Sequence, residues 1–254
     1  MNQLISEILN TQKAVTEKGD VVTLHSSIDR EEVNFLSNLI IKNNLKKSIE
    51  IGCAMGVSSL AICDAIDHNS KDSHHIIVDP FQSTDWQSIG VTNLKKAGFE
   101  NYSLYEEKSE FVLPSLVKNN TKVDFGFIDG WHTFDHTLID FFYINRMLQV
   151  GGIVVIDDVQ MSAVNKVIRY IHKYPCYEFI EAITYPQTTS RNIIEFLKSI
   201  IRSLANLTGK RISNEIFSTG LLESDKKMGT NSSMVAFRKI KEDNDRPWNW
   251  YQNF

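Results

Sequence analysis

Five short apolar segments, each followed by a stretch with helical spacing, constrain the fold of this chain more than any other feature. We predict β-strands there because apolar and β-branched residues dominate short runs that end at turn residues. The predicted strands are residues 47–52, 75–80, 102–105, 123–129 and 153–158. Repeated strand–helix–strand units are typical of a parallel sheet covered by helices on both faces. The sequence therefore predicts a doubly wound α/β fold.

Helical spacing fills most of the intervening stretches. Helices are expected at residues 58–66, 111–117, 133–148 and 161–173, and one more helix is expected to end at Gly98. After about residue 175 the alternation stops, and two late strands at 177–183 and 234–240 are separated by a long connection with helical spacing over 191–207. A connection of this length is usually a functional insertion or an interaction element.

The 254 residues are enough for one large domain with appended pieces. We expect a single domain over 1–254, which consists of a helical N-terminal cap, a ligand-binding core, an insertion and an aromatic tail. These parts are predicted at 1–45, 46–175, 187–231 and 241–254. Within the cap, Ser26 or Ser27 is the expected N-cap of a helix. The insertion helix and the tail are candidate contacts for a homodimer.

Charge and cysteine content narrow the functional classes. A formal net charge of −4 argues against a nucleic-acid binder that works by bulk phosphate attraction. Three cysteines cannot all pair, and Cys53 and Cys63 lie in apolar runs, so a reducing, cytoplasmic location is expected. Glu7 interrupts the region where a signal peptide needs apolar residues, and we predict no transmembrane segment because no run of about 18 apolar residues occurs.

Acidic residues or glycines stand where the predicted strands end. In open α/β sheets, ligands bind outside the carboxyl ends of the strands, near the point where the strand order reverses. These residues are therefore the first candidates for a ligand site. They are Glu50, Gly52, Asp79, Asp129, Gly130, Asp157 and Asp158.

The first strand–turn–helix has the pattern Glu50-x-Gly52-x-x-x-Gly56. Ala54 fills the middle glycine position of the dinucleotide-binding pattern, which favours a ligand without a pyrophosphate. Asp79 ends the second strand, where a carboxylate can accept both hydroxyls of a ribose. Together these features indicate an adenosine-type ligand, although a plain turn at the glycines and a turn-forming Asp-Pro at Asp79 remain alternatives.

Three carboxylates at two strand ends indicate a cation site. Asp129, Asp157 and Asp158 would repel one another unless a cation neutralised them, and carboxylate oxygens suit Mg²⁺. The alternative is that these acids only cap turns and helix N-termini. His132 and His136 have the i, i+4 spacing of a helical zinc pair, but the glutamate of the zinc-protease motif is absent.

These motifs together resemble the class I S-adenosylmethionine-dependent methyltransferases. The metal-dependent O-methyltransferase branch, with the catechol, caffeoyl-CoA and macrocin-type enzymes, is the most similar. The resemblance covers about residues 24–175, and it rests on Glu50-x-Gly52-x-x-x-Gly56-x-Ser58, Asp79, Val123–Asp129 and Gly151–Asp158. It implies a seven-stranded Rossmann-like sheet, mostly parallel with an antiparallel last strand, and N-terminal helices plus a helical insertion before that strand.

The resemblance also implies roles for individual residues. Glu50, Gly52 and Ser58 would surround the methionine part of S-adenosylmethionine, Asp79 its ribose and Ser109 its adenine, with Ser26 or Ser27 near the carboxylate. The full implied cofactor set is Glu50, Gly52, Met55, Gly56, Ser58, Asp79, Pro80, Phe81, Ser109 and Asp129. The implied ligands of a divalent metal, expected to be Mg²⁺, are Asp129, Asp157 and Asp158.

His132 occupies the position where the catechol-type enzymes carry a catalytic lysine. Because its reference pKa lies near neutral pH, this histidine is the expected base, acting beside Asp129; the alternative is that it only caps or packs. The expected reaction is methyl transfer to a hydroxyl of a small molecule or glycan sugar. Trp86 and Trp131 are candidate walls for a sugar or aromatic ring, or else core residues.

Two other interpretations stay open at this point. A nicotinamide-dependent oxidoreductase could use the same sheet, although Ala54 and the absence of a Tyr-Lys pattern disfavour it. A non-catalytic binding protein could keep the fold, although an idle carboxylate trio would be an uncompensated electrostatic cost.

Overall fold

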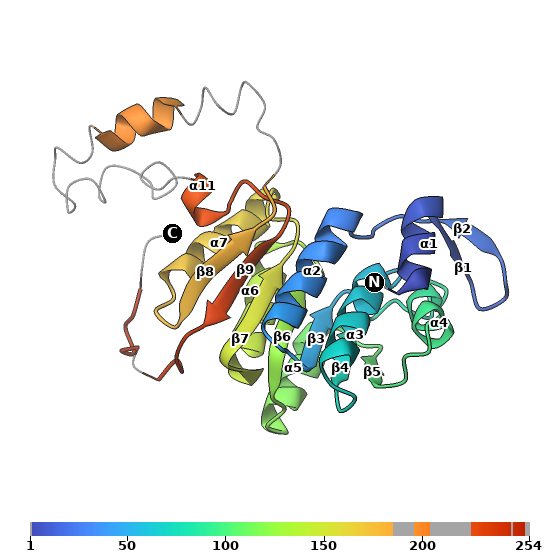
Figure 1. The fold of residues 1–254 in the computed structure, drawn as a ribbon. Helices are drawn as coiled ribbons and strands as arrows, with labels where there is room; N and C mark the ends of the chain where they lie inside the picture. The colour runs from blue at the N-terminus through green and yellow to red at the C-terminus, as the bar shows by residue number, and fades with distance from the viewer. Residues whose placement is uncertain (1, 185–195, 204–224, 245, 252–254) are drawn as a thin grey trace.

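The structure is a computed structural model that describes residues 2–184, 196–203, 225–244 and 246–251. Its centre is a seven-stranded sheet with the order β5-β4-β3-β6-β7-β9-β8 (Figure 1). The strands are β3 (Lys47–Ile51), β4 (His74–Val78), β5 (Tyr102–Tyr105), β6 (Val123–Ile128), β7 (Leu148–Ile156), β8 (Tyr177–Ala182) and β9 (Val235–Lys239). All seven predicted strands are confirmed, with β7 beginning five residues earlier than expected.

The pairing of the strands places the ligand site. β5, β4, β3, β6 and β7 are parallel, whereas β9 pairs antiparallel with both β7 and β8. The chain proceeds outward from β3 through β4 to β5 and then returns to form β6 on the other side of β3. This reversal between β3 and β6 is where such sheets bind ligands. The doubly wound, Rossmann-like sheet with an antiparallel last strand is therefore confirmed.

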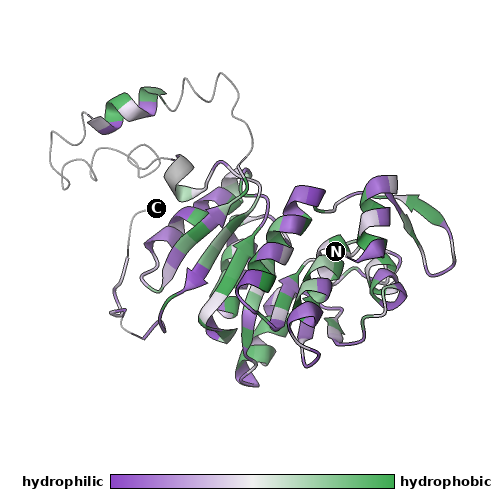
Figure 2. Cartoon of the chain, viewed as in Figure 1, coloured by the Kyte–Doolittle hydropathy of each residue, from purple (hydrophilic) through white to green (hydrophobic). Residues whose placement is uncertain are grey.

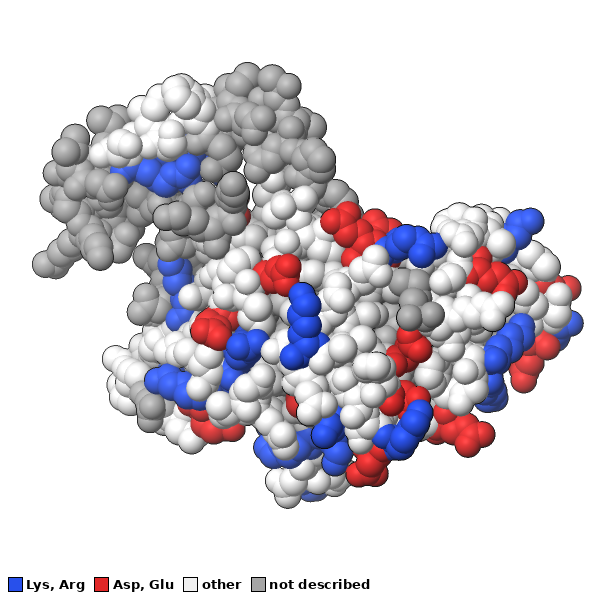
Figure 3. Space-filling view, in the orientation of Figure 1, with Lys and Arg blue, Asp and Glu red and all other residues white. Residues whose placement is uncertain are grey.

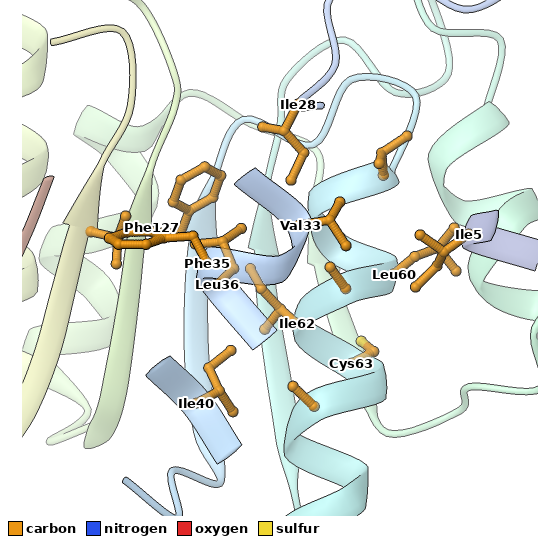
Figure 4. Close-up of a cluster of buried hydrophobic side chains, with 14 of the residues drawn as sticks. Ile5, Ile28, Val33, Phe35, Leu36, Ile40, Leu60, Ile62, Cys63 and Phe127 are labelled. Atoms are coloured by element: carbon orange, nitrogen blue, oxygen red, sulfur yellow. The ribbon is translucent and has the colours of Figure 1, made fainter. Parts of the chain in front are cut away.

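Helices cover both faces of the sheet. On one face lie α1 (Gln3–Thr11), α2 (Arg30–Lys42), α3 (Val57–Asn69) and α4 (Ile89–Lys96), and on the other lie α5 (Ser109–Lys118), α6 (Phe134–Met147) and α7 (Ser162–Lys173). In the first layer, Leu36 of α2 and Ile62 of α3 pack with Phe127 of β6 (Figure 4). The central strands are mostly hydrophobic, whereas the helices carry hydrophobic and hydrophilic residues (Figure 2). Full burial of the sheet explains its near-continuous apolar runs.

The N-terminal segment differs from the prediction in two respects. A two-stranded antiparallel hairpin, β1 (Lys13–Val15) and β2 (Val21–Thr23), interrupts the expected helical cap. The helix α2 is capped by Asp29 and not by Ser26 or Ser27: the Asp29 side chain accepts from the N–H of Glu31 and Glu32, and the Glu32 carboxylate accepts from the N–H of Asp29. The Asp29-x-x-Glu32 spacing of a capping box was the correct signal.

The C-terminal third is described in part. Residues 196–203 are helical, in agreement with the predicted insertion helix, whose remaining residues lie outside the described ones. Asp225, at the start of α11 (Asp225–Met228), forms ion pairs with Arg169 of α7 and with Lys198. No helix in the described part of the chain is both long and apolar enough to cross a membrane.

The predicted aromatic tail packs through one of its rings. Trp250 lies edge-on to Tyr170 and Tyr174, with ring centroids 6.1 and 5.7 Å away, and Arg246 lies over the Tyr174 ring. Trp248 is 97% exposed. Phe254 lies outside the described residues.

Candidate active site

A cavity of about 1080 Å³ opens at the carboxyl ends of the parallel strands. Its wall combines the loops after β3, β4, β6 and β7 with the segment before α2 and the start of α5. Six acidic residues line it: Glu32, Asp79, Glu110, Asp129, Asp157 and Asp158. Among the described lining residues, Lys108 is the single lysine or arginine. On the face drawn in Figure 3, charges of both signs are interspersed.

The loop after β3 lies directly against the end of β6. Gly52 has a φ of +88°, and a Cβ added there would lie 2.8 Å from the carbonyl carbon of Asp129. Gly56 has a different function, because a Cβ there would lie 2.6 Å from the Cα of Gly90 on α4. The missing side chain at Gly52 therefore lets the ends of β3 and β6 approach closely, whereas the one at Gly56 lets the start of α3 pack against α4.

The start of α3 offers free backbone donors to the cavity. Its N-cap, Gly56, makes no side-chain capping bond, and Val57 and Ser58 of the first turn line the cavity. Unpaired N–H groups at a helix N-terminus, together with the helix dipole, favour a negatively charged group.

Asp79 holds the same loop from the side of β4. Its Oδ2 accepts from the N–H groups of Cys53 and Ala54 at 3.0 and 2.8 Å, and from Gln82 Nε2 at 3.0 Å. Its Oδ1 accepts from the N–H of Phe81 at 2.9 Å. Asp79 is 2% exposed and still lines the cavity, so it fixes the loop and also contributes to the cavity wall.

Glu50 lies behind the cavity wall. Because side chains alternate along a strand, Glu50 points to the face opposite Ile49 and Ile51. Its Oε2 accepts from the Ser59 hydroxyl and lies 3.1 Å from His75 Nε2. Glu50 was expected to contact the cofactor, but its side chain does not line the cavity.

Three possible metal ligands lie close together in the cavity, but the third is His132 and not the predicted Asp157. Ligand atoms of Asp129, His132 and Asp158 lie within 4.8 Å of one another. His132 Nε2 lies 3.2 Å from Asp158 Oδ2. The Oδ1 of Asp157 accepts from the N–H of Asp158 at 2.7 Å, and this residue is 8% exposed. Asp157 lines the cavity but is not one of the three residues of the cluster.

Burial and mutual repulsion make these carboxyls hard to ionise. Burial, followed by the charges of Asp157 and Asp158, raises the pKa of Asp129 well above its ordinary value. Burial and the charge of Glu32 do the same to the pKa of Asp157. The pKa of Glu32 is itself raised, chiefly by burial. A cation would relieve this repulsion, and carboxylate oxygens are ligands that Mg²⁺ accepts, so Asp129 and Asp158 fit a metal.

The far end of the cavity and its mouth contain further polar and aromatic groups. Ser109 is the first residue of α5 and lines the cavity with Lys108 and Glu110. At the mouth, Trp131 is 62% exposed, and the Trp86 ring lies 5.7 Å from His25. Both predicted tryptophan walls therefore belong to the cavity lining.

Most of the predicted site residues meet in this single cavity. Those that line it are Gly52, Ser58, Asp79, Pro80, Phe81, Ser109, Asp129, His132, Asp157 and Asp158, with Ser26 and Ser27. Glu50, Met55 and Gly56 do not line it. Glu32, Lys108, Glu110 and Thr133 were missed, and His136, which also lines the cavity, was considered only as half of a zinc pair. Only Glu32 carried a usable signal, since its capping box places it at the start of α2.

Comparison with known sequences shows similarity to methyltransferases. Residues 49–159 match the family model described as Methyltransferase domain. The chain is 28% identical over 160 residues to the flavonoid 3′,5′-methyltransferase of Vitis vinifera, a match that covers 60% of this chain and 63% of that enzyme. It is 29% identical over 168 residues to an uncharacterised protein of Acanthamoeba polyphaga mimivirus, covering 61% and 74% of the two chains. The match thus spans less than two thirds of the grapevine enzyme.

Solved structures share the fold. The O-methyltransferase from Bacillus cereus, in complex with SAH, superimposes with a TM-score of 0.58 at 13% identity and covers 72% of this chain and 86% of that one. The O-methyltransferase TomG from Streptomyces achromogenes, in complex with SAM, gives a TM-score of 0.56 at 16% identity, with 72% and 84% covered. The family match and the confirmed sheet favour the methyltransferase interpretation over the oxidoreductase one. Residues 49–159, less than half of the chain, are similar to a methyltransferase domain, and the sheet has the fold of the solved O-methyltransferases.

Proposed function

We propose that this protein transfers the methyl group of S-adenosylmethionine to a hydroxyl oxygen with the assistance of a divalent metal, Mg²⁺ being the expected ion. The observation that carries the proposal is the position of the Asp129–His132–Asp158 cluster. It lies in the same cavity as the glycine turn, and the backbone of Gly52 touches that of Asp129. A methyl donor held at the turn and an acceptor held at the cluster would therefore be neighbours, and proximity supplies much of the rate in such a transfer.

Three parts of the cavity fit the cofactor. The free N–H groups at the start of α3 suit the carboxylate of its methionine part, with Ser58 beside them. Asp79 lies at the end of β4, where a ribose is expected, and Ser109, the first residue of α5, is our candidate for the adenine contact. A cavity of about 1080 Å³ is within the range of ligand pockets and leaves room for an acceptor.

Asp129 and Asp158 would hold the metal, and Asp157 would add negative charge beside them. When bound, such a metal lowers the pKa of an acceptor hydroxyl and stabilises the negative charge that forms on its oxygen. His132 lies in the same cluster and is our candidate for removing the hydroxyl proton. The ring nitrogen Nε2 faces Asp158, whose charge would stabilise the imidazolium formed.

One feature at the mouth of the cavity supports a proposal for the acceptor. Trp131 exposes most of its ring beside His132, and a flat aromatic or sugar ring can stack on such a surface. We therefore propose a hydroxylated small molecule or a glycan sugar as the acceptor.

Two measurements test the proposal. Titration calorimetry with S-adenosylhomocysteine tests cofactor binding, and methyl transfer from labelled S-adenosylmethionine to a panel of catechols, flavonoids and sugars tests turnover with Mg²⁺, with Mn²⁺ and with excess chelator. Asp129→Asn should abolish metal-dependent turnover and leave the affinity for S-adenosylhomocysteine nearly unchanged.

The matched control is Asp124→Asn on the same strand. Asp124 accepts from the N–H groups of Lys46 and Lys47 at the opposite end of β6, so its replacement should leave turnover intact. Full activity in excess chelator would contradict the role of the metal. Failure to bind S-adenosylhomocysteine at all would contradict the proposal as a whole.

A further inference from the structure

His136, in the first turn of α6, is a cavity residue that the proposed chemistry does not use. It lines the cavity together with Trp131, His132 and Thr133, and it follows the His132 of the metal cluster by four residues. Within the described residues, both polar contacts of the His136 ring are made by Nδ1, and Nε2 has no partner. A ring nitrogen that is unpaired at a cavity wall is available to a ligand.

The contacts of Nδ1 join three side chains. Thr133 is the N-cap of α6, and its hydroxyl accepts from the backbone N–H of His136. The same Oγ1 lies 2.8 Å from His136 Nδ1 and donates to Oδ1 of Asp135. Asp135 Oδ1 also lies 3.5 Å from His136 Nδ1. The contacts therefore run from a carboxylate through a hydroxyl to the imidazole ring.

The ionisation of Asp135 determines where the hydrogens lie. The hydrogen bond from Thr133, more than any other cause, lowers the pKa of Asp135 below its ordinary value, so this carboxyl has no proton at neutral pH. The single hydroxyl proton of Thr133 therefore points to Asp135, and the hydroxyl offers only lone pairs to His136. The 2.8 Å contact then requires a hydrogen on Nδ1, which leaves the lone pair of the neutral ring at Nε2.

We propose that His136 binds the methyl acceptor, and that its Nε2 accepts a hydrogen bond from a second hydroxyl next to the one that reacts at the Asp129–His132–Asp158 cluster. The inference rests on the proposed function and makes the acceptor a diol, either a catechol-type ring or a sugar with two neighbouring free hydroxyls. Thr133 and Asp135 act through His136 and are positioning residues.

The expected selectivity follows from the unpaired nitrogen. An acceptor without the second hydroxyl would cover Nε2 and exclude water without offering a donor, and an unpaired polar atom in such a place is costly. The loss of one hydrogen bond between neutral groups weakens binding by up to about tenfold. The chain should therefore prefer a diol over its monohydroxy analogue by at least about this factor.

The first test compares acceptors that differ by one hydroxyl. Values of kcat/KM are measured for catechol against phenol, for quercetin against kaempferol, and for methyl hexosides against their monodeoxy analogues. His136→Asn keeps an N–H for Thr133 near the place of Nδ1 but has no group at Nε2, so it should lower the diol preference about tenfold. His136→Gln returns an acceptor oxygen near Nε2 and should keep the preference within about threefold of the wild-type value.

His68→Asn is the matched control. His68 is an exposed histidine near the end of α3 and does not line the cavity, so its replacement should leave the diol preference unchanged. Misfolding lowers the turnover of both members of an acceptor pair equally, so their ratio reports on the second hydroxyl alone.

The second test examines the histidine ring directly and needs no acceptor. Long-range ¹H–¹⁵N correlation spectra of the full chain at pH 8, with the His136 signals assigned from their absence in His136→Asn, should show a hydrogen on Nδ1 and none on Nε2. Thr133→Val removes the hydroxyl and should lower both the population of this tautomer and the diol preference. Thr133→Ser should restore both.

Two results would overturn the inference. One is a diol preference that keeps its wild-type size in His136→Asn, because other groups would then hold the second hydroxyl. The other is a neutral His136 ring with its hydrogen on Nε2. A wild-type chain that methylates none of these acceptors would instead reject the proposed function, and the ring measurement distinguishes the two failures because it does not depend on turnover.

Discussion

Replacing Gly52 by alanine tests how tightly the glycine turn is joined to the end of β6. The backbone at Gly52 has a φ of +88°, which side chains other than glycine rarely adopt. The new Cβ would lie 2.8 Å from the carbonyl carbon of Asp129 and closer still to its oxygen. The N–H of Asp129 also donates to the carbonyl of Ile51 at 2.9 Å, so Asp129 cannot retreat without weakening the pairing of β3 with β6.

The expected loss of stability has two parts. The left-handed backbone costs about 1–2 kcal/mol for a residue with a Cβ. Relief of the collision requires a shift of roughly 1 Å, and overpacking of this kind costs about 1–3 kcal/mol. Gly52→Ala should therefore lower the free energy of unfolding by about 2–5 kcal/mol. A displacement of roughly 1 Å at Asp129 should also lower turnover by about 10²-fold.

Gly98→Ala is the matched control for this prediction. Gly98 has a φ of +81°, and a Cβ there would have no atom within 4 Å, so only the backbone cost of about 1–2 kcal/mol applies. Urea unfolding gives the loss of unfolding free energy in each variant, and the difference between the two losses is the cost of the collision. Methyl-transfer assays of both variants measure the effect on turnover. Equal losses of stability in the two variants, or wild-type turnover in Gly52→Ala, would refute the reasoning.

Three further predictions concern charge. Burial raises the pKa of Asp129 and Asp157, so above about pH 4 the folded chain holds more protons than the unfolded chain. Without metal, the free energy of unfolding should therefore fall as the pH rises toward 8. Because bound Mg²⁺ requires the ionised carboxylates, it should raise the melting temperature more at pH 8 than at pH 5. An equal effect of Mg²⁺ at both pH values would count against the site. His132→Gln should lower kcat by about 10²–10⁴ and leave the affinity for S-adenosylhomocysteine nearly unchanged, and a wild-type kcat would exclude this residue as the base. Arg169→Met should lower the free energy of unfolding by about 1–3 kcal/mol in urea titrations, since the buried guanidinium pairs with Asp225, whereas an unchanged midpoint would mean that Lys198 alone holds that carboxylate.

The core of the fold was predictable because it depends on local patterns. Buried parallel strands are short apolar runs between helices, and this pattern located β3 to β9 within a few residues. The hairpin of β1 and β2 was not predicted, because its strands have three residues each, too few to show an alternating period.

The candidate site was predictable where strand ends determine it. Asp79, Asp129 and Asp157 each follow a strand directly, and the topology alone brings them to one edge of the sheet. The residues that were missed enter from elsewhere: Glu32 from the start of α2, and Glu110 from the first turn of α5. Their positions depend on how helices dock against the sheet, which no local pattern specifies.

The order of the strands has a consequence for how the chain is made. β9 lies between β7 and β8, although it follows both of them in the sequence (Figure 1). A ribosome therefore releases β7 and β8 before the strand that joins them, and β8 has no neighbour in the sheet until Val235–Lys239 arrives. During that interval the nascent chain presents unpaired strand edges, which are templates for pairing with other chains. Slower translation of the residues before β9 should lengthen this exposure and increase the fraction of newly made protein that aggregates.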